Sequence, residues 1–76
     1  MYPNPANNVL NIDLNGRPEQ ENIITLFNAY GQIVFSTRVY TSEKVSINIS
    51  HLPSGMYLAQ LESKEGRSTR KFIVED

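Results

Sequence analysis

His51 is the only histidine in the chain, and its side chain is the one best suited to acid–base chemistry near neutral pH. It stands between Ser50 and Leu52, in a segment rich in turn-forming residues. A serine nucleophile needs a base that a buried acid orients, and a strained turn that exposes its hydroxyl. Serines and acids are present, but no such turn is recognisable. We therefore expect His51 to be structural or simply exposed, and we predict that the protein is not an enzyme.

Metal binding is the second chemistry that polar side chains could provide. The acidic residues upstream of the C-terminus are dispersed, and they form no loop of regularly spaced aspartates that would bind calcium. They are Asp13, Glu19, Glu21, Glu43, Glu62 and Glu65. The chain contains no cysteine, which excludes disulfides and thiolate ligands. We expect these carboxylates to be solvated charges, and we predict no metal and no cofactor.

Aromatic side chains offer a third possibility, a platform on which a sugar ring could stack. The chain has seven of them, namely Tyr2, Phe27, Tyr30, Phe35, Tyr40, Tyr57 and Phe72. A domain this small needs most of its large side chains for its core and for cross-strand pairs. A carbohydrate-binding or spacer module of a secreted hydrolase is therefore the alternative function, and the sugar-binding version requires several aromatics exposed on one face.

Length and composition exclude other classes. With 76 residues the chain is a single domain, and its net charge of −1 gives no electrostatic reason to bind nucleic acid or an anionic membrane. No apolar run approaches the roughly 20 residues that span a bilayer, and no secretory leader opens the sequence. Tyr2 follows Met1 without such a leader. We interpret Met1 as an added start and residues 1–76 as one domain of a larger protein whose upstream part is absent.

Short alternating runs separated by turn residues indicate an all-β protein. The predicted strands are Val9 to Leu14, Asn22 to Asn28, Gln32 to Tyr40, Lys44 to Ile49, Met56 to Glu62 and Ser68 to Val74. Six strands with short connections predict an antiparallel β-sandwich or a small barrel. The proline-rich start is expected to add a short edge strand, where the missing donors of proline do least harm. The strand from Asn22 to Asn28 has apolar residues on both faces, which favours a central position.

The connections contain residues that suit tight turns. Asn15-Gly16 opens a loop that the polar run to Glu21 extends, and Gly31 closes a tight turn in which it is free to take a positive φ. In Leu52-Pro53-Ser54-Gly55, the proline presets φ and the glycine redirects the chain into the next strand. We expect Leu52 to close the end of the core.

Four segments, taken in order, carry a resemblance to a known family. They are Tyr2-Pro3-Asn4-Pro5-Ala6, the run from Ile24 to Val34, the run from Ile47 to Leu58, and Lys71-Phe72-Ile73-Val74. The order and spacing resemble the C-terminal sorting domain of cargo proteins of the type IX (Por) secretion system of Bacteroidetes. That family has Pro-Asn-Pro, then a strand ending in Asp or Asn, two further residues and a Gly followed by Lys, Arg or Gln. It continues with Leu-any-Ser/Ala-Gly-any-Tyr and ends on a basic residue followed by apolar ones.

The resemblance implies a compact immunoglobulin-like sandwich of about six to seven strands, and it implies that the domain is an address. A signal peptide takes the cargo, which is covalently linked upstream, to the periplasm. The domain then directs it to shuttle proteins and the outer-membrane translocon. A sortase-like surface protease usually removes the domain, and the cargo reaches the cell surface or the medium.

The resemblance assigns motif positions one by one. They are Pro3, Asn4, Pro5, Gly31, Leu52, Gly55, Tyr57, Lys71, Phe72 and Val74. Most of these are expected to maintain the fold, with Leu52 and Tyr57 buried. Recognition is placed on the last hairpin, Tyr57 to Val74, with Arg67, Arg70 and Lys71 as its outer charges. The last strand also offers an edge for strand addition.

Overall fold

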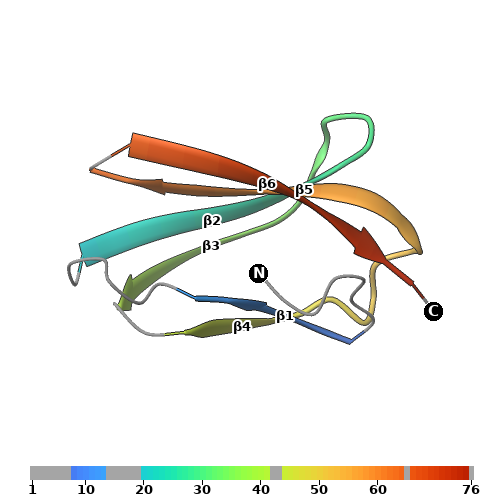
Figure 1. Ribbon diagram of the computed structural model, residues 1–76, viewed down its shortest axis with the longest axis horizontal. Coiled ribbons are helices and arrows are strands. Elements are labelled where there is room, and N and C mark those ends of the chain that lie inside the picture. Colours follow the sequence, from blue (N-terminus) through green and yellow to red (C-terminus); the bar gives the residue numbers. More distant parts are fainter. Residues whose placement is uncertain (1–7, 14–19, 42–43, 65, 76) are drawn as a thin grey trace.

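The computed structural model describes residues 8–13, 20–41, 44–64 and 66–75, and these ranges form two layers of antiparallel β-sheet. One layer is the pair β1–β4, and the other is a four-stranded sheet with the order β3-β2-β5-β6 (Figure 1). The six strands of the described ranges are β1 Val9–Ile12, β2 Gln20–Asn28, β3 Ile33–Thr41, β4 Val45–Asn48, β5 Gly55–Ser63 and β6 Gly66–Val74. The all-β sandwich that the alternating pattern predicts is confirmed.

Some strand boundaries differ from those expected. Glu21, assigned to a loop by its polar surroundings, lies in β2 because it pairs with Tyr40 across the β2–β3 ladder. The last strand begins at Gly66, which pairs with Ser63 and so belongs to the hairpin ladder. The expected edge strand of the proline-rich start, like the Asn15-Gly16 turn, falls outside the described residues.

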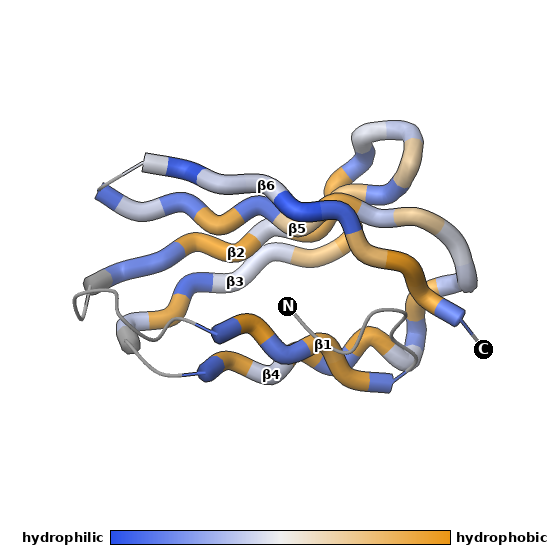
Figure 2. The backbone as a smooth tube through the Cα atoms, in the orientation of Figure 1, coloured by the Kyte–Doolittle hydropathy of each residue, from blue (hydrophilic) through white to orange (hydrophobic). Residues whose placement is uncertain are grey.

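Alternation along the strands builds the core between the two layers. Odd and even residues of a strand face opposite sides, so each strand contributes every second side chain. The buried apolar residues are Leu10, Ile12, Ile24, Leu26, Ile47, Ile49, Leu52, Tyr57, Ala59, Phe72 and Val74. Each fully buried large side chain contributes about 1.5–3 kcal/mol of transfer free energy. Figure 2 shows β6 changing from hydrophilic to hydrophobic toward its C-terminal end, where it joins this core.

The central position predicted for the second strand is confirmed, since β2 pairs with β3 on one side and with β5 on the other. Its inner residues Ile24 and Leu26 are fully buried. Its outer residues Ile23 and Phe27 are half-buried, and no further layer of described residues covers them. We call this solvent side of the four-stranded sheet the outer face.

One end of the sandwich gathers two turns and the end of the last strand, and we call it the turn end. The register places Asn28 beside Tyr57 and Gly55 beside Val74. Figure 1 accordingly shows the β2–β3 turn, the β4–β5 connection and the C-terminus on the same side. Asn8 lies there too, because its carbonyl accepts a 2.9 Å hydrogen bond from the Ile49 N–H. Within the described ranges no helix is long and apolar enough to cross a membrane.

Candidate functional site

The β2–β3 turn at the turn end is organised by Asn28. The Asn28 Oδ1 accepts hydrogen bonds from the backbone N–H groups of Tyr30 at 2.9 Å and Gln32 at 3.0 Å. The backbone closes the same turn, since the Asn28 N–H donates to the Gln32 carbonyl and the Gly31 N–H donates to the Asn28 carbonyl. Gly31 has a φ of +83°, a conformation that glycine adopts at little cost. The motif glycine is therefore a turn residue, as its sequence context predicts.

The β4–β5 connection is anchored on both sides. The Leu52 N–H donates a 3.0 Å hydrogen bond to the Ile49 carbonyl, and the Leu52 side chain is buried in the core. The Asn48 Oδ1 accepts hydrogen bonds from the Ser50 N–H at 2.9 Å and from the Ser50 hydroxyl at 2.7 Å. Gly55 follows with a φ of +151° and starts β5. The predicted burial of Leu52 is confirmed.

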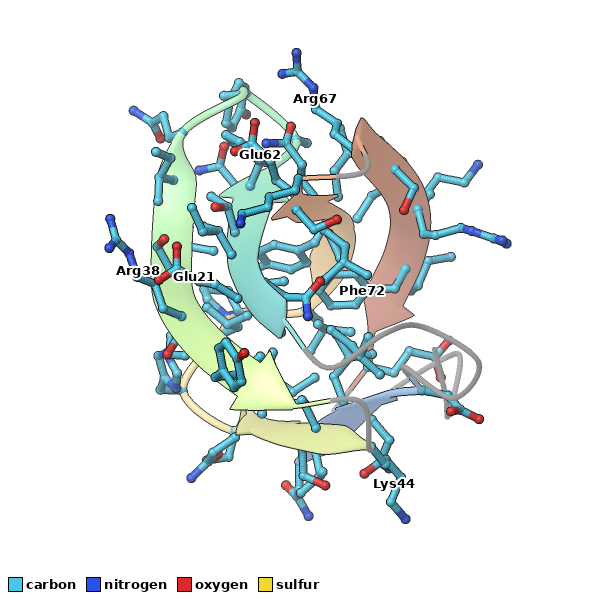
Figure 3. The ribbon with its side chains drawn as sticks, turned by 90° about the vertical axis from the view of Figure 1, so that its left-hand side faces the viewer. Glu21, Arg38, Lys44, Glu62, Arg67 and Phe72 are labelled. Atoms are coloured by element: carbon cyan, nitrogen blue, oxygen red, sulfur yellow. The ribbon has the colours of Figure 1, made fainter. Side chains whose placement is uncertain are left out.

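Tyr57 ties this connection to the last strand. Its side chain is 5% exposed, and its hydroxyl donates a 2.6 Å hydrogen bond to the carbonyl of Pro53. Its ring stacks on that of Phe72, with centroids 5.6 Å apart and planes at 22°, because the two residues are cross-strand partners. Figure 3 shows the Phe72 side chain directed into the interior between the strands. Four motif positions, Leu52, Gly55, Tyr57 and Phe72, thus belong to one packed unit.

Arg70 and Lys71 lie next to each other in β6 but face opposite sides of the sheet. Lys71 is opposite Leu58 on the outer face, whereas Arg70 is opposite Ala59 and shares the inner face with Phe72. Both side chains are exposed. Arg70 borders a groove with about 270 Å³ of open space, whose other lining residues are Ile12, Ala59, Gln60, Leu61 and Ser68.

The charges at the opposite end of the four-stranded sheet form cross-strand pairs. Arg67 faces Glu62 in the β5–β6 ladder. Arg38 lies with its Nη1 3.9 Å from the Glu21 Oε2, and both side chains are well exposed. Figure 3 shows Arg38 and Glu21 directed away from the core. Such exposed pairs are worth little to stability.

The exposed aromatics do not lie together. Tyr57 and Phe72 are buried, as expected of most aromatics, and Phe27 and Phe35 are half-buried. Tyr30 is 91% exposed in the turn before β3, and Tyr40 is 69% exposed near the far end of that strand. The seven residue steps from Ile33 to Tyr40 alone place them roughly 23 Å apart. Among the described residues the required single aromatic face is therefore not formed.

A shallow hollow opens at the turn end between the two turns. It has about 490 Å³ of open space and is lined by Asn28, Ala29, Tyr30, Pro53, Ser54, Gly55, Met56 and Tyr57. Its polar groups are largely engaged in turn hydrogen bonds. His51, on the same connection, is exposed, and no group of three or more potential metal ligands occurs in the described part of the chain. The turn end therefore presents a shaped surface whose polar groups mainly hold the turns.

Sequence reasoning did not single out Asn28 and Gln32, which build the β2–β3 turn. Besides the backbone contacts, the Asn28 Nδ2 donates a 2.9 Å hydrogen bond to the Gln32 Oε1. The signal was available, because an asparagine that ends a strand three residues before a glycine suits a side-chain-capped turn. The motif residues Pro3, Asn4 and Pro5 lie outside the described residues.

Comparison with known proteins adds an independent observation. The family model described as "Secretion system C-terminal sorting domain" matches residues 1–75, which include all four segments quoted from the sequence. No curated protein matches the chain.

Proposed function

The chain belongs to the family of type IX secretion system C-terminal sorting domains, and on that premise we propose the route by which it sorts its cargo. The domain is a C-terminal sorting signal that works with the type IX machinery, and its cargo is secreted or displayed at the cell surface. The observation that carries the proposal is the match over residues 1–75. The joining of motif residues in one packed end of the fold supports it.

The proposed route has three steps. The cargo, joined upstream, crosses the periplasm carrying this domain as a folded, non-catalytic ligand. Shuttle proteins and the outer-membrane translocon of Bacteroidetes recognise the domain and pass the cargo outward. A sortase-like surface protease then removes the domain as its substrate. The immunoglobulin-like class of the sandwich is part of the same proposal.

Recognition is proposed for the last hairpin, Tyr57 to Val74. Its buried residues, above all Tyr57 and Phe72, hold the fold and are not accessible to a partner. Its basic residues Arg67, Arg70 and Lys71 are exposed. A partner that selects this domain by its surface therefore meets these charges, of which Lys71 is itself a motif position, and not the buried motif residues beneath them.

The test is an export assay with the full 76-residue chain. It is fused to the C-terminus of a fluorescent protein that carries a signal peptide, in a bacterium with a working type IX system. We expect fluorescence at the surface or in the medium, and retention in the periplasm of a translocon-deficient strain. A reporter without the domain is the matched control. Equal export of both reporters, or export without the translocon, would count against the function.

A truncation before Ser68 is a weaker control, because it removes Phe72 and Val74 from the core. Such a protein is expected to unfold, so its failure to reach the surface would not separate sorting from stability. A glycan-binding screen on the purified chain tests the alternative module. If the chain binds a glycan and the reporter is exported equally with and without the domain, the alternative module is favoured.

A further inference from the structure

The outer face of the four-stranded sheet has an apolar half next to the turn end. Phe27 of β2 pairs with Ile33 of β3 and with Leu58 of β5, so these three side chains form one row across the sheet. Met56 and Ile73 are cross-strand partners in the adjoining row on the same face. We call these five residues the outer apolar patch.

The patch is exposed to solvent. Ile33 is 64% exposed, Met56 46%, Ile73 43% and Leu58 37%, and Phe27 is half-buried. Four of the seven large hydrophobic side chains that are exposed in the described ranges therefore lie side by side. Scattered surface hydrophobics are ordinary, but a contiguous group of them marks a place of contact with another molecule.

The rest of the outer face has a different character. The next row holds Ser36, Thr25, Gln60 and Thr69. The far end holds the charged pairs described above, with Ile23 and Tyr40 between them. The Thr25 hydroxyl lies 3.4 Å from that of Ser36, so these two groups bond to each other. The apolar residues are thus concentrated at the turn end.

Lys71 lies at the border of the patch, so a partner that covers the patch also meets a positive charge. Lys71 continues the row of Phe27 and Leu58, and the residue opposite it is that leucine. Arg67 is instead opposite Glu62, and Arg38 lies 3.9 Å from Glu21. The neighbours of Lys71 on the same face of β6 are Thr69 and Ile73. A partner that covers the patch therefore approaches the Lys71 ammonium group, and a carboxylate at that border complements its charge.

We propose that the outer apolar patch with Lys71 is the surface by which this domain docks on a protein of the secretion machinery. The partner presents an apolar surface bordered by a carboxylate. This inference rests on the proposed function, and it moves recognition from the hairpin as a whole to one face of the sheet. Five side chains make a small contact, which suits a carrier that must later release its cargo.

The test uses the export reporter with two matched pairs of substitutions in the full chain. Lys71→Glu and Lys44→Glu make the same charge change at two exposed lysines, one beside the patch and one just before β4. Ile33→Thr lies inside the patch and Tyr40→Thr outside it, both on the outer face of β3. The two positions have similar exposure, and threonine favours strands at both. Lys71→Arg keeps the charge and serves as the conservative variant.

We expect Lys71→Glu and Ile33→Thr to lower the exported fraction about tenfold, in the range of interface hot spots. Lys44→Glu, Tyr40→Thr and Lys71→Arg should stay within about twofold of the parent chain. Melting temperatures of the purified full chains are measured in parallel, and only variants that melt within a few degrees of the parent are compared. If Ile33→Thr melts lower, Ile33→Val, which keeps a branched apolar surface, must restore both folding and export.

Equal losses for Lys71→Glu and Lys44→Glu, or no loss for either, would overturn the docking surface. So would equal losses for Ile33→Thr and Tyr40→Thr. The proposed function fails separately, when the parent fusion itself is not exported in a translocon-dependent way.

Discussion

Replacing Tyr57 by phenylalanine tests whether a single hydroxyl holds the β4–β5 connection onto the sheet. The substitution removes the 2.6 Å hydrogen bond to the Pro53 carbonyl. It keeps the ring, which is 5% exposed and stacks on Phe72 at 5.6 Å. Any loss of stability therefore reports on the hydrogen bond and not on the packing.

The magnitude follows from where the acceptor lies. Pro53 is exposed, so its carbonyl can bond to water once the hydroxyl is gone, and the net loss is about 1 kcal/mol. For a domain of this size that lowers the melting temperature by about 4–8 °C. Tyr57→Ala also removes the ring from the core and should cost about 3–5 kcal/mol. A 76-residue domain has only about 4–11 kcal/mol of total stability, so the alanine variant is close to unfolding.

Thermal and chemical denaturation of the purified chain, followed by circular dichroism, measures these differences. Tyr40→Phe, at a side chain 69% exposed, is the matched control and should melt like the parent. If Tyr57→Phe also melts like the parent while Tyr57→Ala is strongly destabilised, the hydroxyl contributes nothing and the anchoring role is wrong.

Three further changes are checked by the same denaturation experiments. Gly31→Ala should lower the free energy of unfolding by about 1–2 kcal/mol through the positive φ alone, since nothing lies within 4 Å of an added Cβ. Gly31→Asn should lower it less, and equal losses for the two variants would contradict this explanation. Asn28→Ala should cost about 1–2 kcal/mol by removing the acceptor of two turn N–H groups, and Asn28→Asp, which keeps an acceptor, should cost less. Arg38→Gln should change stability by less than about 0.5 kcal/mol, because its 3.9 Å contact with Glu21 is exposed; a larger loss would show a stronger pair.

Several strands could be predicted because they alternate apolar and polar residues against one core. Leu10 and Ile12 fall on one face of a short run, and the structure buries both. The polar run before Asn22 misled the prediction of Glu21, because local composition does not register its pairing with Tyr40. At Glu21, pairing in the β2–β3 ladder outweighed the loop preference of the polar residues around it.

The arrangement of the candidate site was less accessible to sequence reasoning. The two-residue period of a strand already separates Arg70 from Lys71. It does not reveal that the inner face is left open at Arg70, since that depends on how far the β1–β4 layer extends. The pairing of β2 with β5 joins segments about 30 residues apart, and without it Ile33 and Phe27 would not share a row with Leu58 and Lys71. Contacts of this range are set by the tertiary fold.

Apart from Lys71, the motif positions that the structure describes and the surface that we propose for a partner are different sets of residues. Leu52, Tyr57 and Phe72 are buried, so a partner reaches them only if the domain unfolds, and their substitution removes the fold before it removes any contact. Loss of export in such variants is therefore evidence about stability. Residues such as Ile33 and Lys71 cost the fold little when changed, because they are exposed. If sorting depends on surface recognition, loss of export at an unchanged melting temperature must be confined to exposed positions, and the outer apolar patch is where we expect it.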